Sequence, residues 1–440
     1  MFLTSSTVRS RTALGGCTGS LGLAIAFALS PVVPLQSAHA ATACAAAWQA
    51  GTVYTGGNTA SENGSNYVAN WWTQGDDPAT HSGAAGSGQP WTSQGSCSGG
   101  GSTPPTNPPP GDPPPSNPPP AAGSLLFSPY KDITINLDWN TNIMSTLVTG
   151  TRIPVVGSGS LVSTQVPNLG AITLAFATGE CGSENWGGVP AAAFASANIA
   201  RLNSAGVNYV VSTGGQAGTF TCGSSAGMAK FIQTYQSSHL VGIDFDIEAG
   251  QTPAQLSALI ANAKYAEGLY PNLRFSFTLA TLAASDGSYG GLNNTGDTVV
   301  RAVLASGLQH YTINLMTMDY GAAGPAICVV SGGSCDMGLS AIQAARNLQH
   351  TYGIPLTKIE LTPMIGVNDV SSETFTLQDI DEVTAYAATN KLAGVHFWSL
   401  DRDTPCANGN NSGYASPTCN SVSGTSALQY TRRFLSDLGR

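Results

Sequence analysis

Charged side chains are scarce in this sequence. Asp, Glu, Lys and Arg make up 9% of the 440 residues, well below the roughly 25% that is usual for soluble domains. The balance is acidic, with a net charge of -9 and only 16 Lys and Arg residues. Because nucleic-acid binding requires a basic surface, this composition argues against a nucleic-acid partner, whereas a neutral polysaccharide remains compatible with it.

Long apolar runs are lacking beyond the amino terminus. No run after residue 40 approaches the roughly 18 apolar residues of a membrane span, so no membrane partner is expected. Residues 1–40 have the pattern of a signal peptide, with Arg9 and Arg11 before the apolar stretch Leu21–Leu29 and a small-residue cleavage site at Ala38–Ala40. The sequence therefore predicts a secreted, extracellular protein.

Cys and His residues of zinc-site spacing are also lacking, so no metal is expected. Nine cysteines are present, and Cys17 leaves with the leader. The remaining eight are even in number in an exported protein, which predicts disulfides. Spacing favours, without fixing, the pairs Cys44–Cys97, Cys181–Cys222, Cys328–Cys335 and Cys406–Cys419.

Proline is abundant in one place only. Eleven of the 26 prolines lie in residues 99–123, in Pro-rich runs typical of an extended, semi-rigid spacer. This spacer separates a small module at residues 41–98, which is expected to be all-β, from a large domain at residues 124–440. Such a tether raises the concentration of the large domain at an insoluble surface that the module binds.

The small module is rich in aromatic residues. It is too short to bury all of them, and flat rings suit the apolar faces of pyranose sugars. Its run Tyr67–Gln74, followed by Trp91, resembles carbohydrate-binding module families 5 and 12, with Asn70 in place of the usual Lys. The resemblance implies chitin binding through Tyr67, Trp71, Trp72 and Trp91. Trp48 is expected in the core, and if residues 71 and 72 lie in a strand, one of this Trp pair is core and the other binds.

The large domain alternates strand-like and helix-like segments. This alternation predicts a parallel sheet, and eight repeats favour a (β/α)8 barrel over a doubly wound sheet, because no phosphate-binding Gly-x-Gly-x-x-Gly turn follows the first strand. The expected strands are Ile133–Leu137, Ala171–Ala177, Val207–Ser212, Val241–Ile247, Phe275–Leu279, Thr312–Met318, Ile359–Met364 and Gly394–Trp398. The expected helices are Ala191–Leu202, Ser225–Ser237, Pro253–Leu269, Thr298–Leu308, Leu339–Thr351, Leu377–Ala388 and Ser426–Leu438.

The fourth expected strand carries three acids on one face. Alternation of side chains places Asp244, Asp246 and Glu248 together, opposite apolar neighbours. Burying three carboxylates is costly, and like charges this close raise at least one pKa. A carboxylic acid that keeps its proton near neutral pH is suited to general acid catalysis, and the carboxyl end of a barrel strand is where active sites lie.

This stretch resembles the Asp-Gly-x-Asp-x-Asp-x-Glu signature of glycoside hydrolase family 18, the chitinases. Gly242 and the three acids match, and Val241 stands where the family has its first Asp. The resemblance implies that Glu248 is the acid/base, that Asp246 supports the substrate's acetamido group and that Asp244 tunes Asp246.

Other strand ends resemble the same family. Ser212-Thr-Gly-Gly215 matches its Ser-x-Gly-Gly motif and is expected to approach the acids. Asn314–Gly321 resembles its Met-x-Tyr-Asp motif, with Met316 and Asp319 matching and Met318 in place of the Tyr. The resemblance implies that Asp319 holds the N-acetyl group, with Tyr320 as a candidate for the missing hydroxyl and Met316 as either core or substrate-binding.

Three further predictions concern the cleft. The resemblance implies that Trp398 forms the floor of the subsite where the bond breaks, and His396 is expected to be a satisfied core histidine. Candidates for the cleft walls are Trp186, Tyr289, Asn368 and Asp369.

The family resemblance implies a monomeric, cofactor-free chitinase that acts on chitin and N-acetylglucosamine oligosaccharides by substrate-assisted retaining catalysis. Two alternatives stay open. One is an endo-β-N-acetylglucosaminidase acting on glycoprotein glycans, and the other is a non-catalytic chitin-binding protein, which the presence of Glu248 disfavours.

Overall fold

The computed structural model describes residues 42–50, 52, 54–71, 73–84, 87–97, 125–248, 250–407 and 413–440. The expected signal peptide and Pro-rich spacer lie outside these residues. The chain divides into two compact units, within Met1–Pro110 and Gly111–Arg440. Among the helices described, none combines the length and apolar character needed to cross a membrane.

The amino-terminal unit is a small antiparallel-rich sheet closed by a disulfide. Its strands pair in the order β1 (Thr59–Glu62), β2 (Ser65–Ala69), β4 (Trp91–Ser96) and β3 (Ser82–Gly83). A small core forms between them, and the Cys44–Cys97 bond joins its two ends. So few residues bury little apolar surface, so the crosslink is an important part of the stability of this unit.

The carboxy-terminal unit is built on a parallel sheet that closes into a barrel, as the sequence predicted. Both edge segments of the sheet, β5 and β6, belong to one stretch of chain, Leu126–Asp132, whose first part pairs with β23 and whose second part pairs with β9. In pairing order the segments are β5 (Leu126–Phe127), β23 (Gly394–Val395), β20 (Ile359–Thr362), β17 (Tyr311–Met316), β16 (Arg274–Ala280), β15 (Leu240–Asp246), β13 (Asn208–Gly214), β9 (Ala171–Ala177) and β6 (Tyr130–Asp132).

The position of the first strand was predicted wrongly. The apolar segment Ile133–Leu137 forms a turn whose ends, Ile133 and Leu137, are fully buried in the core. The true first strand, Leu126–Asp132, is interrupted by Pro129, which has no N–H to donate to a ladder. Burial made both segments apolar, so hydrophobicity did not distinguish the strand from the turn.

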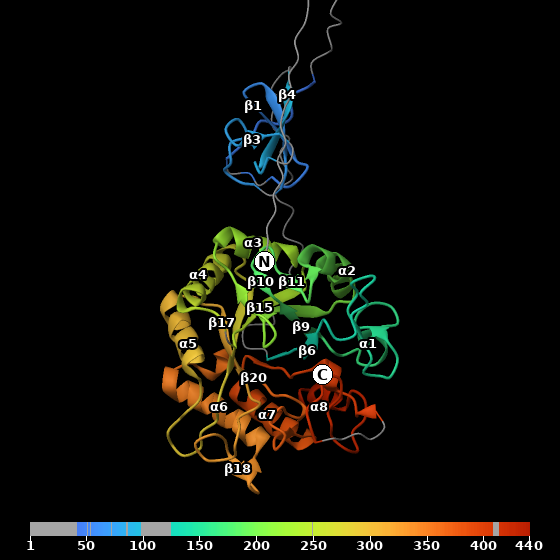
Figure 1. Cartoon of the computed structure of the whole chain (residues 1–440), viewed down its shortest axis with the longest axis vertical. Helices are drawn as coiled ribbons and strands as arrows, with labels where there is room; N and C mark the ends of the chain where they lie inside the picture. Colours follow the sequence, from blue (N-terminus) through green and yellow to red (C-terminus); the bar gives the residue numbers. More distant parts are fainter. Residues whose placement is uncertain are drawn as a thin grey trace, which may run out of the picture. The chain divides into compact units, whose positions relative to one another are not determined.

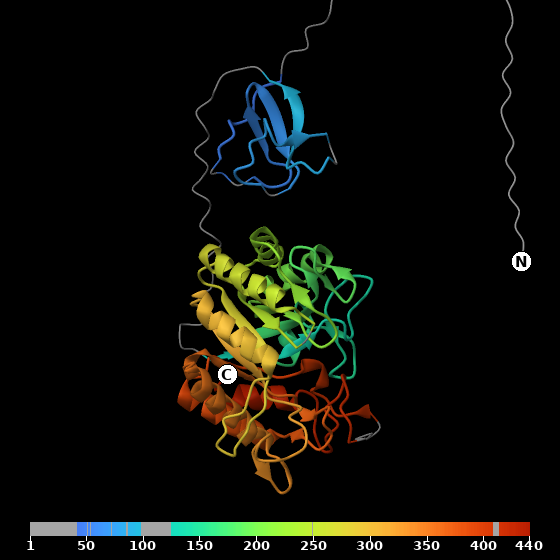
Figure 2. The same ribbon diagram turned by 60° about the vertical axis from the view of Figure 1, so that its left-hand side comes forward.

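The helices surround the strands (Figure 1). Helices α4 and α5, yellow in Figure 2, pack side by side over one part of the barrel wall. The helices are α1 (Leu161–Thr164), α2 (Ala191–Ser204), α3 (Ser225–Thr234), α4 (Pro253–Leu269), α5 (Asn294–Ser306), α6 (Met337–Tyr352), α7 (Leu377–Asn390) and α8 (Gln429–Asp437). The seven predicted helices are thus confirmed, with ends that differ by a few residues.

Local sequence explains where these helices begin and end. At the start of α4, the Thr252 side chain accepts the Gln255 N–H while the Gln255 side chain accepts the Thr252 N–H, and Pro253 occupies the first turn. Helix α6 begins at Asp336, whose side chain accepts the Leu339 N–H, and ends at Gly353 in the left-handed conformation.

Short strand pairs lie in the loops between the barrel strands and helices. They are β7 (Ser145–Thr146) with β8 (Ile153–Pro154), β10 (Gly179–Glu180) with β14 (Phe220–Thr221), β11 (Asn185–Trp186) with β12 (Val189–Pro190), β18 (Val330–Ser331) with β19 (Ser334–Cys335), and β21 (Gly366–Val367) with β22 (Thr374–Phe375).

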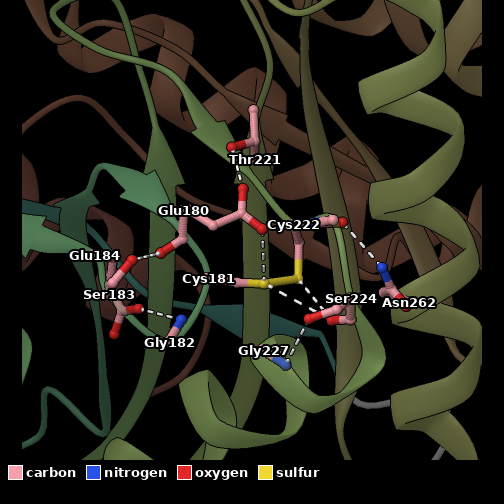
Figure 3. Close-up of a disulfide and its surroundings, with 11 residues drawn as sticks. Glu180, Cys181, Gly182, Ser183, Glu184, Thr221, Cys222, Ser224, Gly227 and Asn262 are labelled. Carbon is pink, nitrogen blue, oxygen red and sulfur yellow. Dashed lines mark hydrogen bonds between the residues drawn. A yellow bond between two sulfur atoms is a disulfide. The ribbon is translucent and has the colours of Figure 1, made fainter. Parts of the chain in front are cut away.

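All four predicted disulfides are formed. Figure 3 shows the Cys181–Cys222 bond, which joins the loops that follow β9 and β13. Beside it, the Glu180 carboxylate accepts the Thr221 hydroxyl at 2.5 Å and the Gly223 N–H at 2.6 Å. With 41 residues between its ends, loop-closure entropy alone makes this crosslink worth about 4 kcal/mol. The bond therefore fixes two neighbouring loops of the barrel mouth to each other.

Candidate active site

The carboxyl ends of the barrel strands surround a cleft with an interior of ≈ 120 Å³. Parallel strands all end on the same side of a barrel, so side chains distant in sequence meet there. The lining residues are Tyr130, Phe176, Gln216, Asp246, Glu248, Thr278, Met316, Met318, Asp319, Thr362, Met364, Asp369 and Trp398. The acids of the fourth strand thus lie in this cleft or directly beneath it.

Asp244 is buried beneath the cleft and fully engaged. Its Oδ2 accepts the hydroxyls of Ser212 at 2.6 Å and Tyr130 at 2.9 Å, and its Oδ1 accepts those of Ser276 and Thr278, each at 2.7 Å. Burial raises the pKa of Asp244, and the four hydroxyls oppose this by stabilising the anion. Four donors occupy the accepting positions of an ionised carboxylate, so this geometry suits a negative charge on Asp244.

Asp246 lies between Asp244 and Glu248 and is also buried. Burial raises its pKa well above the ordinary value, and the charges of Glu248 and Asp244 raise it further. Among the described residues, no donor is within hydrogen-bonding distance of its buried Oδ1. A buried polar atom without a partner is costly, and this one borders the cleft, where a bound molecule can supply the missing partner.

Glu248 is half-buried at the end of the acid series. Burial raises its pKa, and the charge of Asp319, which reaches the cleft from the loop after β17, adds to the rise. Burial likewise raises the pKa of Asp319, whose Oδ1 accepts the Val370 N–H at 3.0 Å. Glu248 therefore holds its proton to a higher pH than an exposed Glu, which a general acid requires.

Trp398 forms one wall of the cleft. Its ring stacks on that of Phe176, with centroids 5.5 Å apart and an interplanar angle of 19°. Met316 and Met318 also line the cleft, so Met316 is not simply a core residue. An aromatic and thioether surface next to the acids suits the apolar face of a sugar ring.

The Ser-x-Gly-Gly motif brings β13 against the acid strand, as predicted. Gly214 has φ +86°, and a Cβ there would overlap the carbonyl oxygen of Asp246. Only glycine accommodates both conditions without strain. This close approach lets Ser212 reach Asp244 in the neighbouring strand.

Several predicted cleft residues lie elsewhere. Tyr320 is buried in the core and does not line the cleft, so it does not supply the hydroxyl missing at Met318. Its side chain leaves the cleft because the chain turns at Asp319, which has φ +53°. Trp186 is fully buried and stacks on Phe194 at 4.3 Å, so its assignment to the cleft wall was also wrong.

Of the three remaining candidates for the cleft walls, one lines the cleft and two do not. Asp369 lines the cleft. Asn368 is buried and donates to the carbonyls of Met364 and Gly366, which removes it from the cleft. Tyr289 stacks on His350, with ring centroids 3.5 Å apart, outside the residues that line the cleft.

His396 is the buried core histidine that the sequence predicted. Its Nδ1 lies 2.9 Å from the Ser128 hydroxyl, and its Nε2 lies 3.4 Å from a carboxylate oxygen of Glu360. Both ring nitrogens have partners inside the barrel, away from the cleft.

The sequence analysis missed two aromatic residues of the site. Tyr130 donates its hydroxyl to Asp244 and lines the cleft, but it lies in the strand that was misplaced. Phe176, on β9, supports Trp398. The available signal for Tyr130 was its position within a short apolar segment that completes the set of eight strands.

The aromatic residues of the small module also require correction. Trp91 is fully buried and donates its Nε1 proton to the Asp76 carbonyl at 2.8 Å, and Tyr67 is buried beside it, so both are core residues and not binding residues. Trp48 packs against the same cluster, as expected. Trp71 is 47% exposed and follows the end of β2 instead of lying in it. Trp72 lies outside the described residues.

A larger hollow lies elsewhere on the barrel unit. It measures ≈ 780 Å³, lies between the segment 141–167 and α2, and is lined mainly by small and polar side chains without an acid. Its volume is larger, but it lacks the convergent titratable groups that mark an active site.

Three comparisons with known proteins agree with this geometry. Residues 47–92 match the model of carbohydrate-binding module family 5/12. Over 427 residues, the chain is 26% identical to the Probable bifunctional chitinase/lysozyme of Escherichia coli (strain K12), covering 82% of this chain and 45% of that protein. Endochitinase 11 of Metarhizium anisopliae is 30% identical over 232 residues, covering 48% of this chain and 42% of that protein. The chain thus spans less than half the length of these relatives.

The fold has solved counterparts. The catalytic domain of a hyperthermophilic chitinase from Pyrococcus furiosus is 24% identical, with a TM-score of 0.53, and the match covers 72% of this chain and 95% of that domain. The chain therefore has a segment that matches carbohydrate-binding module family 5/12 and, in its second unit, the barrel fold seen in that chitinase domain.

Proposed function

We propose that the protein is a secreted chitinase that hydrolyses the β-1,4 bonds between N-acetylglucosamine units. The observation that carries this proposal is the buried Oδ1 of Asp246, which lacks a partner beside the protonatable Glu248 in the cleft. The N–H of a substrate acetamido group is a donor of the required kind. Chitin carries this group on every sugar, and the chitinase-named relatives point to the same substrate.

The cleft residues account for each step of a substrate-assisted reaction. Glu248 donates its proton to the glycosidic oxygen as the bond to the anomeric carbon breaks. The acetamido oxygen of the substrate attacks that carbon and forms an oxazolinium ion. Asp246 accepts the acetamido N–H and offsets the positive charge. Glu248 then takes a proton from water as the water oxygen attacks the anomeric carbon. This attack opens the oxazolinium ring and gives a product with net retention of the β configuration.

Asp244 supports this sequence from beneath. Its four hydroxyl partners stabilise its anion, and burial together with the charges of Glu248 and Asp244 raises the pKa of Asp246. The negative charge on this pair offsets the positive charge that develops on the acetamido group in the transition state.

Product analysis tests this function. N-acetylchitohexaose is expected to yield shorter N-acetylglucosamine oligomers, first detected by NMR as β anomers, whereas cellohexaose is expected to remain intact because it lacks the nucleophile. Inverted products, or equal cleavage of both substrates, would contradict the mechanism. Release of intact glycans from a glycoprotein with no cleavage of the hexaose would instead indicate the endo-β-N-acetylglucosaminidase activity.

The exposed Trp71 is the expected sugar contact of the small module. Replacing it with Ala is expected to weaken binding to insoluble chitin about tenfold, because a single well-placed Trp often dominates a binding surface. Binding is measured by depletion from solution, in a Glu248→Gln background that leaves the chitin intact. Tyr265→Ala, which removes an aromatic ring that is 50% exposed on α4, is the matched control and should bind normally. Equal binding by Glu248→Gln alone and by the same protein with Trp71→Ala or Tyr265→Ala would exclude Trp71 as the sugar contact.

A further inference from the structure

Glu373 is a buried acid that does not line the cleft but contacts the loop that does. It is fully buried at the start of β22. Its Oε2 accepts the Tyr320 N–H at 3.0 Å, and its Oε1 accepts the Gly321 N–H at 2.9 Å. These are the two N–H groups that directly follow Asp319 in the chain. The Glu373 carboxylate therefore binds the backbone on which Asp319 is mounted.

This turn requires external support. Asp319 has φ +53° and Gly321 has φ +108°. The left-handed conformation costs a non-glycine residue about 1 kcal/mol, so it persists only where surrounding contacts hold it. The segment that contains Glu373 supplies a third contact, because the Val370 N–H donates to Asp319 Oδ1 at 3.0 Å. Two N–H bonds to the backbone and one to the side chain thus fix Asp319 from one segment.

The supporting segment is itself rigid. The Glu373 N–H donates to the Val370 carbonyl at 2.8 Å, and the Glu373 carbonyl accepts the Asn368 N–H at 3.0 Å. Strands β21 and β22 pair on either side of it. A displaced Glu373 side chain would therefore release the turn at residues 319–321 without unfolding the hairpin that carries it.

We propose that Glu373 is a positioning residue, whose buried carboxylate holds Asp319 in the cleft beside Glu248 by binding the two N–H groups that follow Asp319. This inference deepens the proposed function and depends on it only for its kinetic readout. The proposed role is indirect, since Glu373 is absent from the cleft lining and acts through the Asp319 turn.

The charges around Asp319 and Glu373 determine which measurement detects the loss of the Glu373 contact. Asp319 faces Asp369, Arg402, Glu373 and Glu248, and its charge raises the pKa of Glu248. Glu248 also faces Asp246. Burial raises the pKa of Glu373, and the N–H groups of Gly321 and Tyr320 lower it. If Asp319 moves away, Glu248 loses a neighbouring negative charge and its pKa falls.

The test is Glu373→Gln. The amide keeps the shape of the side chain but offers one acceptor and one NH₂ group, which opposes one of the two backbone N–H groups. We expect the Glu248 pKa, followed by NMR titration of the substrate-free protein, to fall by about half a unit or more. The basic limb of the kcat/KM profile should move to lower pH by the same amount, and kcat should fall about tenfold.

Glu184→Gln is the matched control. Glu184 is also buried, and it accepts the Gly182 N–H at 2.7 Å (Figure 3) and the Tyr235 hydroxyl at 2.9 Å. It is not among the residues that line the cleft. It should lose stability without a change in the Glu248 titration. Glu373→Asp, whose shorter stem holds the carboxylate farther from the two N–H groups, is expected to lower the Glu248 pKa by a smaller amount than Glu373→Gln. This smaller shift decides the matter if Glu373→Gln does not fold.

The outcomes separate the two proposals. An unchanged Glu248 pKa and pH profile in folded Glu373→Gln, or in Glu373→Asp where the amide does not fold, would overturn the positioning role, as would an equal shift in Glu184→Gln. If Glu373→Gln lowers the Glu248 pKa but the wild-type protein does not cleave N-acetylchitohexaose, the positioning role is supported and the chitinase function is rejected.

Discussion

Replacing Glu248 with Gln is expected to lower kcat on N-acetylchitohexaose about 10³-fold, with KM nearly unchanged. The amide retains the shape of the side chain but has no proton to donate to the leaving oxygen, and general acid catalysis by a positioned group contributes roughly 10²–10⁴ to the rate. Glu248 contacts the reacting atoms only as the bond breaks, so the ground-state affinity for the sugar should persist.

Initial rates from wild type and Glu248→Gln, followed by mass spectrometry, measure this effect. Glu184→Gln controls for the loss of an acid outside the cleft and should retain most of the wild-type kcat. Calorimetry with the hexaose checks that Glu248→Gln still binds. A mutant kcat within tenfold of wild type would assign the proton transfer to another group, and Asp319 would then be the next candidate.

Replacing Asp246 with Asn is expected to lower kcat about 10²–10³-fold on the same substrate. The amide keeps an oxygen that can accept the acetamido N–H, so binding should change little. It cannot carry the negative charge that offsets the oxazolinium ion. The loss should therefore appear in kcat and not in KM.

The thermal stability of Asp246→Asn provides a second test. In the folded protein, burial and the neighbouring acids raise the pKa of Asp246 above its unfolded value. The folded state then binds the proton more tightly, so ionisation of Asp246 reduces stability as the pH rises above the ordinary carboxyl range. Asp246→Asn lacks this ionisation, and its melting temperature should exceed that of wild type by more at pH 7 than at pH 4. A variant that is less stable at every pH would indicate disrupted packing, and its kcat would not report on charge.

The sequence predicted the acid strand well because its chemistry is local. Asp244, Asp246 and Glu248 alternate with apolar residues, and the two-residue period of a strand places them on one face whatever surrounds it. Three disulfides were well constrained, since Cys44–Cys97 closes the small module and Cys328–Cys335 and Cys406–Cys419 enclose short loops, and all four expected pairs are present. The helices followed from the helix-like segments that alternate with the strand-like ones.

The first barrel strand was misplaced because hydrophobicity reports burial and not the hydrogen-bond pattern. Ile133–Leu137 is apolar because its ends are buried in the core, and Leu126–Asp132 is short and interrupted by Pro129. Closure of the sheet requires a segment that pairs with β23 at one end and β9 at the other. That condition involves residues more than 260 positions apart, and no local window contains it.

The sequence by itself determined that this chain has a three-acid strand end and a barrel-type alternation of elements, because both depend on neighbours in the chain. Only the tertiary structure decided that Tyr130 reaches Asp244, that Tyr320 leaves the cleft, that Trp91 is core while Trp71 is exposed, and that Glu373 holds the Asp319 turn. The exposure of a side chain, its charged neighbours and the contacts that support a turn all come from segments that meet only in the folded barrel or module. They therefore depend on packing and not on sequence spacing.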